Sequence, residues 1–327
     1  MLKAILFLYK SLISLEAYNF HNSFGETTLN KKKCYVFVPE KKWKGIIVVI
    51  HGMTVKGIED KRLWKQCEIL RQMNYKVYLP HYPEIQNLKI NKESIHKIKK
   101  DILEIYKENQ KPIKILSVSF SGGLSIVASS KKEIRNKVDS LLIIGTYANI
   151  KTIFEFFIKE ENIDPYGYFI LLKNFLEIIP EYKNQKLKKV FELAAKDNAL
   201  STNFLEAYLS KNPDLKKIFQ KLSCDKRFKI KILKRILNSP VIKDLGNSLD
   251  VLPVVKNLNS RIALIHGKYD KVIPPNESIL IIQECKKYNI PTQICLTSIL
   301  DHGNVQFNLG LVKEFIRLIQ TLDFFLK

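Results

Sequence analysis

The sequence predicts an α/β fold in which a doubly wound, mostly parallel sheet is interrupted by a helical insertion. Short apolar runs typical of buried strands alternate with segments of helical periodicity over residues 33–150 and again over residues 251–327. Such alternation is typical of a parallel sheet with helices on both faces. From residue 151 to residue 250 the alternation stops and only helical patterns remain. We therefore expect a core made of the first two segments, an insertion over residues 151–250, and an N-terminal helix with its lead-in over residues 1–32.

The N-terminal segment has the pattern of an amphipathic helix. Lys3 and Lys10 lie opposite an apolar face, whose members are Leu2, Ile5, Leu6, Tyr9, Leu12 and Ile13. The uninterrupted apolar run over residues 4–9 is too short to span a membrane and short for a signal peptide. Two interpretations stay open, a helix packed on the domain and a helix lying at a membrane surface. A cleaved signal sequence is a third.

The elements of the core follow in chain order. Each expected strand is a short apolar run, and each expected helix repeats its apolar residues at intervals of three and four. The expected strands are residues 33–39, 45–50, 76–79, 113–118, 140–145, 261–266 and 292–296. The expected helices are residues 62–73, 92–108 and 124–130.

The insertion has the periodicity of several helices, expected at residues 151–161, 166–176, 182–195, 201–209 and 214–238. Large apolar side chains gather in the first two, namely Phe154, Phe156, Phe157, Tyr166, Tyr168, Phe169, Ile170, Leu171, Leu172 and Phe175. These side chains either line a site for an apolar ligand or form the core of the insertion itself. Both interpretations stay open.

One apolar run ends in a turn of small residues, Ser117-Val-Ser-Phe-Ser-Gly-Gly123, and passes directly into a helix. Strand, sharp turn and helix are the context of a nucleophile elbow, which needs small residues two positions before and after the nucleophile. Ser119 fits, although serines stand where glycines are usual. In a second register Ser121 is the nucleophile. We prefer Ser119 because it follows the apolar run without a gap and leaves Gly122 and Gly123 for close helix packing. The alternative without chemistry is a Ser-rich turn that only caps a helix.

Other expected strand ends also carry residues that can take part in chemistry. His51 and Gly52 follow the second strand, Asp270 follows the sixth, and His302 follows the last. Because the carboxyl ends of parallel strands meet at one edge of a sheet, these residues and Ser119 are expected to share one site.

In this order of serine, acid and histidine, the chain resembles the α/β-hydrolase family. The resemblance covers both core segments. It implies that Ser119 is a nucleophile, that His302 is its general base, and that Asp270 orients and stabilises the histidine. Asp301 is a competing acid, but its direct adjacency to His302 makes the required side-chain geometry less natural.

The resemblance also implies an oxyanion hole and a lid. Two backbone N–H groups are expected to stabilise the oxyanion, that of Phe120 after the nucleophile and that of Met53 in the loop after the second strand. The insertion stands where the family commonly places a helical cap. The residues expected around the substrate are His51, Gly52, Thr54 and Ser121.

The function expected from this resemblance is that of a serine hydrolase, which cleaves a carboxylic ester through an acyl-enzyme. The apolar insertion favours a substrate with an acyl chain, such as a monoacylglycerol or a lysophospholipid. A catalytically silent binding protein of the same fold and a serine peptidase or thioesterase are the alternatives. No cofactor and no metal are expected, because glycine-rich dinucleotide turns, Walker loops and zinc-ligand spacing are absent from the sequence.

The composition limits the partners. The formal net charge is +22, which raises the question of nucleic acid or anionic membrane. Lysines are spread through every segment and no nucleic-acid motif accompanies them, so no nucleic acid is expected and peripheral contact with an anionic membrane stays open. Five scattered cysteines without CxxC spacing fit a reducing compartment, and we expect a cytoplasmic protein.

Overall fold

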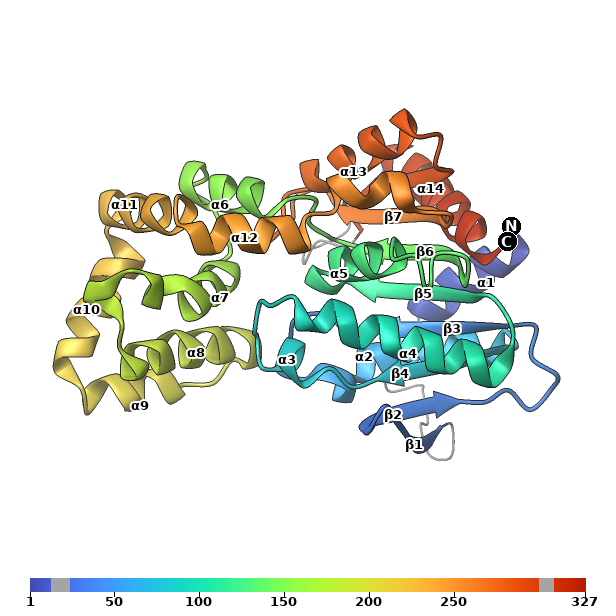
Figure 1. The fold of residues 1–327 in the computed structure, drawn as a ribbon, viewed down its shortest axis with the longest axis horizontal. Helices are drawn as coiled ribbons and strands as arrows, with labels where there is room; N and C mark the ends of the chain where they lie inside the picture. Colours follow the sequence, from blue (N-terminus) through green and yellow to red (C-terminus); the bar gives the residue numbers. More distant parts are fainter. Residues whose placement is uncertain (13–23, 300–308) are drawn as a thin grey trace.

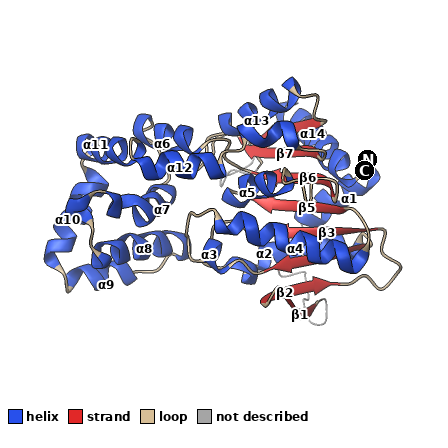
Figure 2. Ribbon diagram, in the orientation of Figure 1, coloured by secondary structure: helices blue, strands red, loops and turns tan. Residues whose placement is uncertain are grey.

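The computed structural model describes residues 1–12, 24–299 and 309–327. Eight strands form one sheet in the order β1-β2-β4-β3-β5-β6-β7-β8 (Figures 1 and 2). The pairs β1/β2 and β2/β4 are antiparallel and all other neighbours are parallel. The strands are β1 (Gly25–Leu29), β2 (Lys32–Phe37), β3 (Gly45–Ile50), β4 (Tyr75–Pro80), β5 (Ile113–Val118), β6 (Val138–Ile144), β7 (Arg261–Gly267) and β8 (Thr292–Thr297). The mostly parallel sheet predicted from the sequence is confirmed.

Both faces of the sheet are covered, which is why the central strand β3 is apolar throughout. In β3, Ile46 and Val48 belong to one buried cluster, whereas Ile47 and Val49 belong to the other. Side chains alternate between the faces of a strand, so a strand buried on both faces can be apolar at every position. The first cluster includes helices α4 (Glu93–Asn109), α5 (Phe120–Ser129) and α13 (Asn276–Lys287). The second includes α1 (Leu2–Leu12), α2 (Lys61–Gln72) and α14 (Leu309–Leu326). A short helix, α3 (Pro83–Gln86), follows β4.

The chain between β6 and β7 is helical, and Figure 1 shows these helices at one end of the long axis of the molecule, beyond the sheet. They are α6 (Ile150–Lys159), α7 (Pro165–Phe175), α8 (Gln185–Leu200), α9 (Phe204–Ser210), α10 (Pro213–Cys224), α11 (Lys226–Leu237) and α12 (Pro240–Leu249). Phe154 of α6 and Phe191 of α8 share one buried cluster with Ile115 of β5. The insertion therefore packs on the core through a continuous apolar interior.

The prediction of a single helix over residues 214–238 is wrong, because the structure has two helices there, α10 and α11. The chain turns at Asp225, whose backbone is extended and whose carboxylate caps α11 by accepting from the N–H of Phe228 at 3.0 Å. Helix α12 was not expected. It begins at Pro240 behind the cap Ser239, and proline is favoured in the first turn of a helix.

The insertion leaves and rejoins the core at one place. The N–H of Val251 donates to the carbonyl oxygen of Ala148 at 2.8 Å. Two carboxylates, the partly buried Asp250 and the buried Glu277, hold the start of α6. Asp250 accepts from the N–H of Ile150 at 2.8 Å, and Glu277 accepts from the N–H of Ala148 at 2.8 Å. Burial raises the pKa of both carboxyls.

A second contact fixes α7 to the core. The Lys173 ammonium donates to the carbonyl oxygens of Asn87 and Leu88, and the Asn174 amide donates to Leu88 and accepts from the N–H of Ile90 at 3.0 Å. Leu88 has a positive φ of 55°, so these bonds stabilise a strained turn. Burial lowers the pKa of Lys173 to about 8.

The N-terminal region differs from the expectation in two ways. Strand β1 was not expected; it forms a hairpin with β2 through Asn30 and Lys31, both at positive φ. Helix α1 does pack on the core, but through Ala4, Phe7 and Leu8 rather than through the expected apolar face. Among the helices in the described part of the chain, none is long and apolar enough to cross a membrane.

Candidate active site

Ser119 lies in a strained turn between β5 and α5. Its φ and ψ are 59° and −137°, a conformation that non-glycine residues rarely adopt. Its N–H donates to the carbonyl oxygen of Ile144 at 2.7 Å, which ties the turn to the end of β6. Among described residues its hydroxyl donates to no acceptor. Strain of this kind persists only where the surrounding structure enforces it, and it is concentrated at functional sites.

Two glycines let α5 approach the sheet closely enough to enforce the turn. A Cβ atom at Gly122 would lie 2.4 Å from Cγ2 of Ile143, and one at Gly123 would lie 2.4 Å from the ring of Tyr147. Only glycine fits at these two positions. The close helix packing predicted for Gly122 and Gly123 is confirmed.

Ser121 occupies a different environment from Ser119. It is fully buried in the first turn of α5, and its hydroxyl donates to the carbonyl oxygen of His51 at 2.6 Å. This bond ties α5 to the end of β3. The environment of Ser121 favours a structural part in the site over contact with a substrate.

His51 is fully buried and neutral. Its Nδ1–H donates to the carbonyl oxygen of Gly52 at 2.9 Å, and its Nε2 accepts from the N–H of Tyr82 at 3.2 Å. These partners fix the tautomer, since one can only accept and the other can only donate. Burial lowers the pKa of His51 to about 4. Like Ser121, it does not line the cavity described below.

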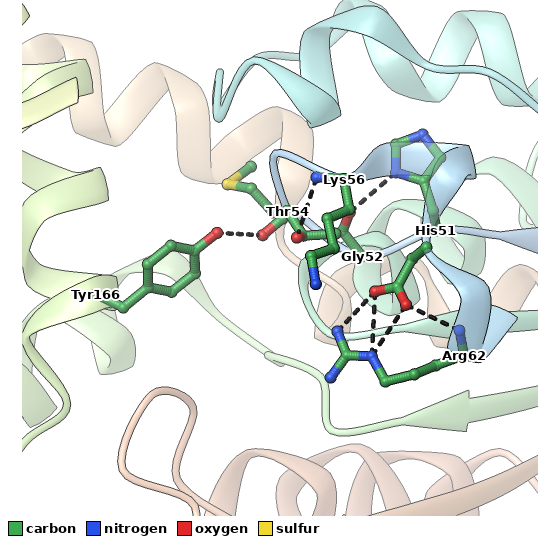
Figure 3. Close-up of polar contacts among 8 residues, drawn as sticks. His51, Gly52, Thr54, Lys56, Arg62 and Tyr166 are labelled. Carbon is green, nitrogen blue, oxygen red and sulfur yellow. Dashed lines mark hydrogen bonds and ion pairs between the residues drawn. The ribbon is translucent and has the colours of Figure 1, made fainter. Parts of the chain in front are cut away.

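The loop after β3 lies against the Ser119 turn. A Cβ atom at Gly52 would lie 3.4 Å from Cβ of Ser119, so the two backbones are neighbours. Met53 lines the cavity, and its carbonyl oxygen accepts from the hydroxyl of Tyr166 at 2.7 Å (Figure 3). Thr54 closes the following turn by accepting from the N–H of Gly57 at 3.0 Å. In the described part of the chain, neither the N–H of Met53 nor that of Phe120 donates a hydrogen bond.

Farther along this loop, Asp60 caps α2, as Figure 3 also shows. Its carboxylate accepts from the backbone N–H of Arg62 at 3.0 Å and pairs with the Arg62 guanidinium at 2.6 Å. Burial alone raises the pKa of Asp60, but these bonds outweigh it and leave the pKa below its usual value. The pair anchors the far end of the loop.

Asp270 lies in the loop after β7. Its Oδ1 accepts from the N–H groups of Val272 and Ile273 at 2.8 and 2.9 Å. Its Oδ2 lies 3.6 Å from Nε2 of His266 and would be 3.6 Å from a Cβ atom at Gly145. Burial alone raises the pKa of Asp270, but the His266 imidazole and the two N–H groups outweigh it and hold the pKa below its usual value.

The two backbone bonds leave Oδ2 as the oxygen that can meet a further donor. His266 itself is occupied elsewhere, since its Nε2–H donates to Ile273 at 2.9 Å and its Nδ1 accepts from Ser278 at 2.7 Å. His302 and the competing Asp301 lie outside the described residues. Their pairing with Asp270 and Ser119 stays a prediction.

An apolar cavity with a volume of about 70 Å³ opens beside Ser119. Residues of the core, of the loops and of helices α6 and α7 line it: Met53, Ile90, Ser119, Phe120, Tyr147, Ile150, Ile153, Phe154, Phe157, Tyr166, Gly167, Ile170, Leu171, Phe175, Val272 and Ile273. The hydroxyls of Tyr147 and Tyr166 are engaged with the carbonyl oxygens of Leu249 and Met53. Ser119 therefore lies at a site for an apolar group.

Sequence reasoning located the serine turn but missed several lining residues. The aromatic cluster of α6 and α7 was noticed, and Phe154, Phe157, Tyr166 and Phe175 do line the cavity. Tyr147 and Ile90 were missed because each follows an ordinary strand or helix without a distinguishing motif. Among described residues, no group of three or more His, Cys, Asp or Glu side chains could hold a metal ion.

No protein-family model and no curated protein sequence matches the chain. Solved structures do. An acylaminoacyl peptidase in complex with Z-Gly-Gly-Phe-chloromethyl ketone matches with a TM-score of 0.53 and 12% identity, over 94% of this chain and 42% of that one. The acylaminoacyl peptidase of Pyrococcus horikoshii matches with a TM-score of 0.52 and 13% identity, over 92% of this chain and 40% of that one.

A third structure is of similar size to this chain. Thermogutta terrifontis esterase 2, phosphoramylated by tabun, matches with a TM-score of 0.51 and 10% identity, over 94% of this chain and 97% of that one. The chain thus spans less than half of each peptidase and nearly all of the esterase. At these identities the likeness concerns the fold.

Proposed function

We propose that this chain, which has the α/β-hydrolase fold, is a serine hydrolase that cleaves small carboxylic esters with an apolar acyl group. The observation that carries the proposal is the position of Ser119, held at a φ of 59° with its side chain at the lining of an apolar cavity. Fold alone does not select among the activities that it hosts, so the argument rests on the site.

In the proposed reaction, the Ser119 hydroxyl attacks the ester carbonyl carbon and transfers its proton to His302. The oxyanion that forms is stabilised by the N–H groups of Phe120 and Met53. His302 then donates the proton to the alcohol oxygen, which leaves, and the acyl group stays on Ser119. Water deprotonated by His302 releases the acid in the second half of the reaction. Asp270 Oδ2 supports the histidine in its charged form.

Two features support Ser119 over Ser121 as the nucleophile. Ser119 has the strained backbone and lines the cavity, whereas Ser121 is buried and bonded to His51. A hydroxyl already donating at 2.6 Å inside the protein is neither accessible nor free to be activated.

The cavity supports a short acyl group. A volume of about 70 Å³ corresponds to roughly two water molecules at about 30 Å³ each, so we expect short acyl chains to be preferred over long-chain fatty acyl groups. The lining offers few polar groups to hold a peptide backbone, which favours an ester over a peptide. In this proposal, helices α6 and α7 form the cap over the cavity.

The test is labelling with a fluorophosphonate, followed by peptide mapping of the wild type, Ser119→Ala and Ser121→Ala. We expect label on Ser119 that is lost in Ser119→Ala and kept in folded Ser121→Ala. A panel of p-nitrophenyl esters of increasing chain length, with a peptide p-nitroanilide as control, then gives the substrate class. Folded wild-type protein that takes no label would indicate a binding protein of the same fold instead.

A further inference from the structure

Helix α1 is apolar around nearly its whole circumference. Of its eleven residues, only Lys3, Lys10 and Ser11 are polar. One face packs on the core, where Ala4, Phe7 and Leu8 are buried in the cluster that includes α2 and α14. A helix that is apolar all round is normally buried all round.

The opposite face of α1 is exposed. It carries Leu2, Ile5, Leu6 and Tyr9, whose exposed fractions are 82%, 40%, 42% and 66%. Residues three and four apart lie on one side of a helix, so these four side chains form a continuous stripe, here called the α1 stripe. These four residues belong to the apolar face expected from the sequence, and in the structure their side chains are left in solvent.

Positive charge borders the α1 stripe. Lys3 and Lys10 are two helical turns apart and lie along one edge of the stripe. Lys44, in the loop before β3, is close to Lys3: burial and the charge of Lys3 lower the pKa of Lys44 to about 8. Lys41 and Lys42 are exposed in the same loop.

Lys10 donates to the amide oxygen of Gln72, and two nearby carboxylates in the described part of the chain are engaged with other groups. The carboxylate that α14 brings to this end of the molecule, Asp323, is paired with the N-terminal ammonium and with Lys327. The carboxylate of Glu40, which directly precedes the lysines of residues 41–44, lies 3.8 Å from the guanidinium of Arg71. An exposed apolar stripe flanked by lysines is the pattern of helices that lie in the interface of an anionic membrane.

We propose that the α1 stripe inserts into the headgroup region of an anionic lipid bilayer, with Lys3, Lys10 and the lysines of residues 41–44 against the lipid phosphates. The charges favour this occupant over a second copy of the chain. A symmetric contact between two stripes would bring the lysines of both copies together, in a protein whose formal net charge is already +22.

This orientation leaves the candidate active site in water. Figure 1 places α1 at the end of the long axis opposite helices α8, α9 and α10. A bilayer that holds α1 is therefore remote from the insertion, and the substrate reaches the cavity from the aqueous phase. The inference does not depend on the proposed hydrolase activity.

The experiment is sedimentation of the full chain with phosphatidylcholine vesicles, with and without phosphatidylserine, at low and high salt. We expect binding to the anionic vesicles that salt weakens. Leu2→Ser/Tyr9→Ser should lower the affinity by at least about tenfold, since it removes the two most exposed apolar side chains of the stripe. Lys3→Gln/Lys10→Gln should weaken binding and flatten its salt dependence.

The matched control is Leu200→Ser/Phe204→Ser, which removes two exposed apolar side chains at the other end of the molecule and should bind like the wild type. Circular dichroism checks that each variant is folded. The inference would be overturned if the wild-type protein did not bind anionic vesicles, or if the Leu2/Tyr9 variant bound them as well as the wild type does. A dimer that dissociates in the Leu2/Tyr9 variant would assign the stripe to a second copy instead.

Discussion

The hydroxyl of Tyr166 donates a hydrogen bond to the carbonyl oxygen of Met53 at 2.7 Å. Tyr166 belongs to α7 and Met53 to the loop beside Ser119, so this one bond links the inserted helices to the loop expected to stabilise the oxyanion. Both residues line the cavity. The positions of the inserted helices and of this loop are therefore coupled.

Replacing Tyr166 by phenylalanine should lower kcat by about tenfold and leave KM nearly unchanged. The lost bond releases the Met53 peptide, and a less well-positioned N–H stabilises the transition state by about 1.4 kcal/mol less. Steady-state kinetics on a short-chain ester measures both constants. Tyr168→Phe is the control, because the Tyr168 hydroxyl bonds to Leu222 in the insertion. An increase in KM alone would mean that Tyr166 contacts the substrate and does not act through Met53.

His51 should make the protein sensitive to acid. Its pKa is about 4 in the folded chain and 6.5 when unperturbed, so between these pH values the unfolded state binds a proton that the folded state does not. Stability contributed by neutral His51 is therefore lost as the pH falls through this window, by about 3 kcal/mol in total. Burial is the main cause of the lowered pKa of His51, and a proton on Nε2 would also meet the N–H of Tyr82.

The measurement is the free energy of unfolding of the wild type and His51→Gln at a series of pH values. The variant is expected to be less stable near neutral pH but to lose less stability on acidification. His96→Gln, at an exposed position of α4, serves as the control. Parallel pH curves for the wild type and His51→Gln would contradict the assignment of acid sensitivity to His51.

Gly122→Ala should destabilise the protein although alanine favours a helix. The added Cβ would lie 2.4 Å from Ile143 and 2.7 Å from Thr146, so the turn at Ser119 must shift. Overpacking of this kind costs about 1–3 kcal/mol, against a gain in helix propensity of about 1 kcal/mol. Denaturant unfolding measures the difference. Gly25→Ala, where a Cβ atom meets nothing within 4 Å, should be nearly neutral; equal effects at both positions would contradict the packing argument.

Ile153→Trp should shift the acyl preference toward shorter chains. Ile153 lines the cavity from α6 and is only partly buried, so a larger side chain can fill the cavity without disrupting the core. The ratio of kcat/KM for four-carbon and eight-carbon p-nitrophenyl esters should rise by about tenfold. Ile158→Trp, on the same helix but away from the cavity, should leave the ratio unchanged. A ratio that moves equally in both variants would place the acyl group elsewhere.

The sequence allowed the central sheet and the Ser119 turn to be predicted because both follow local rules. The buried strands are short apolar runs, and the turn needs small residues at fixed positions, as Gly122 and Gly123 show. Strand β1 was missed because its residues Gly25–Leu29 are mostly exposed and carry no apolar alternation. The end of α10 was missed because apolar residues continue at helical spacing past Asp225, so the sequence gives no sign that one helix ends there and another begins.

Only part of the candidate site could be predicted from the sequence. The bond between Tyr166 and Met53 joins residues 113 positions apart and depends on how the insertion packs, which no local pattern encodes. The same holds for Ser121, whose hydroxyl is turned to His51 by the packing of α5 on β3. The roles of Ser119, Asp270 and His302 in catalysis remain predictions.

The bond from Val251 to Ala148 makes the inserted helices exchangeable in principle. Because the outgoing and returning chains touch there, a graft that replaces residues 150–249 by another helical segment, or by a short turn, needs no new path across the core. Changes of substrate range can therefore arise by recombination at this one junction while the turn that holds Ser119 is kept. Each new segment has to rebuild its contacts with the core, among them those that Lys173 and Asn174 make with residues 87–90 and the bond from Tyr166 to Met53.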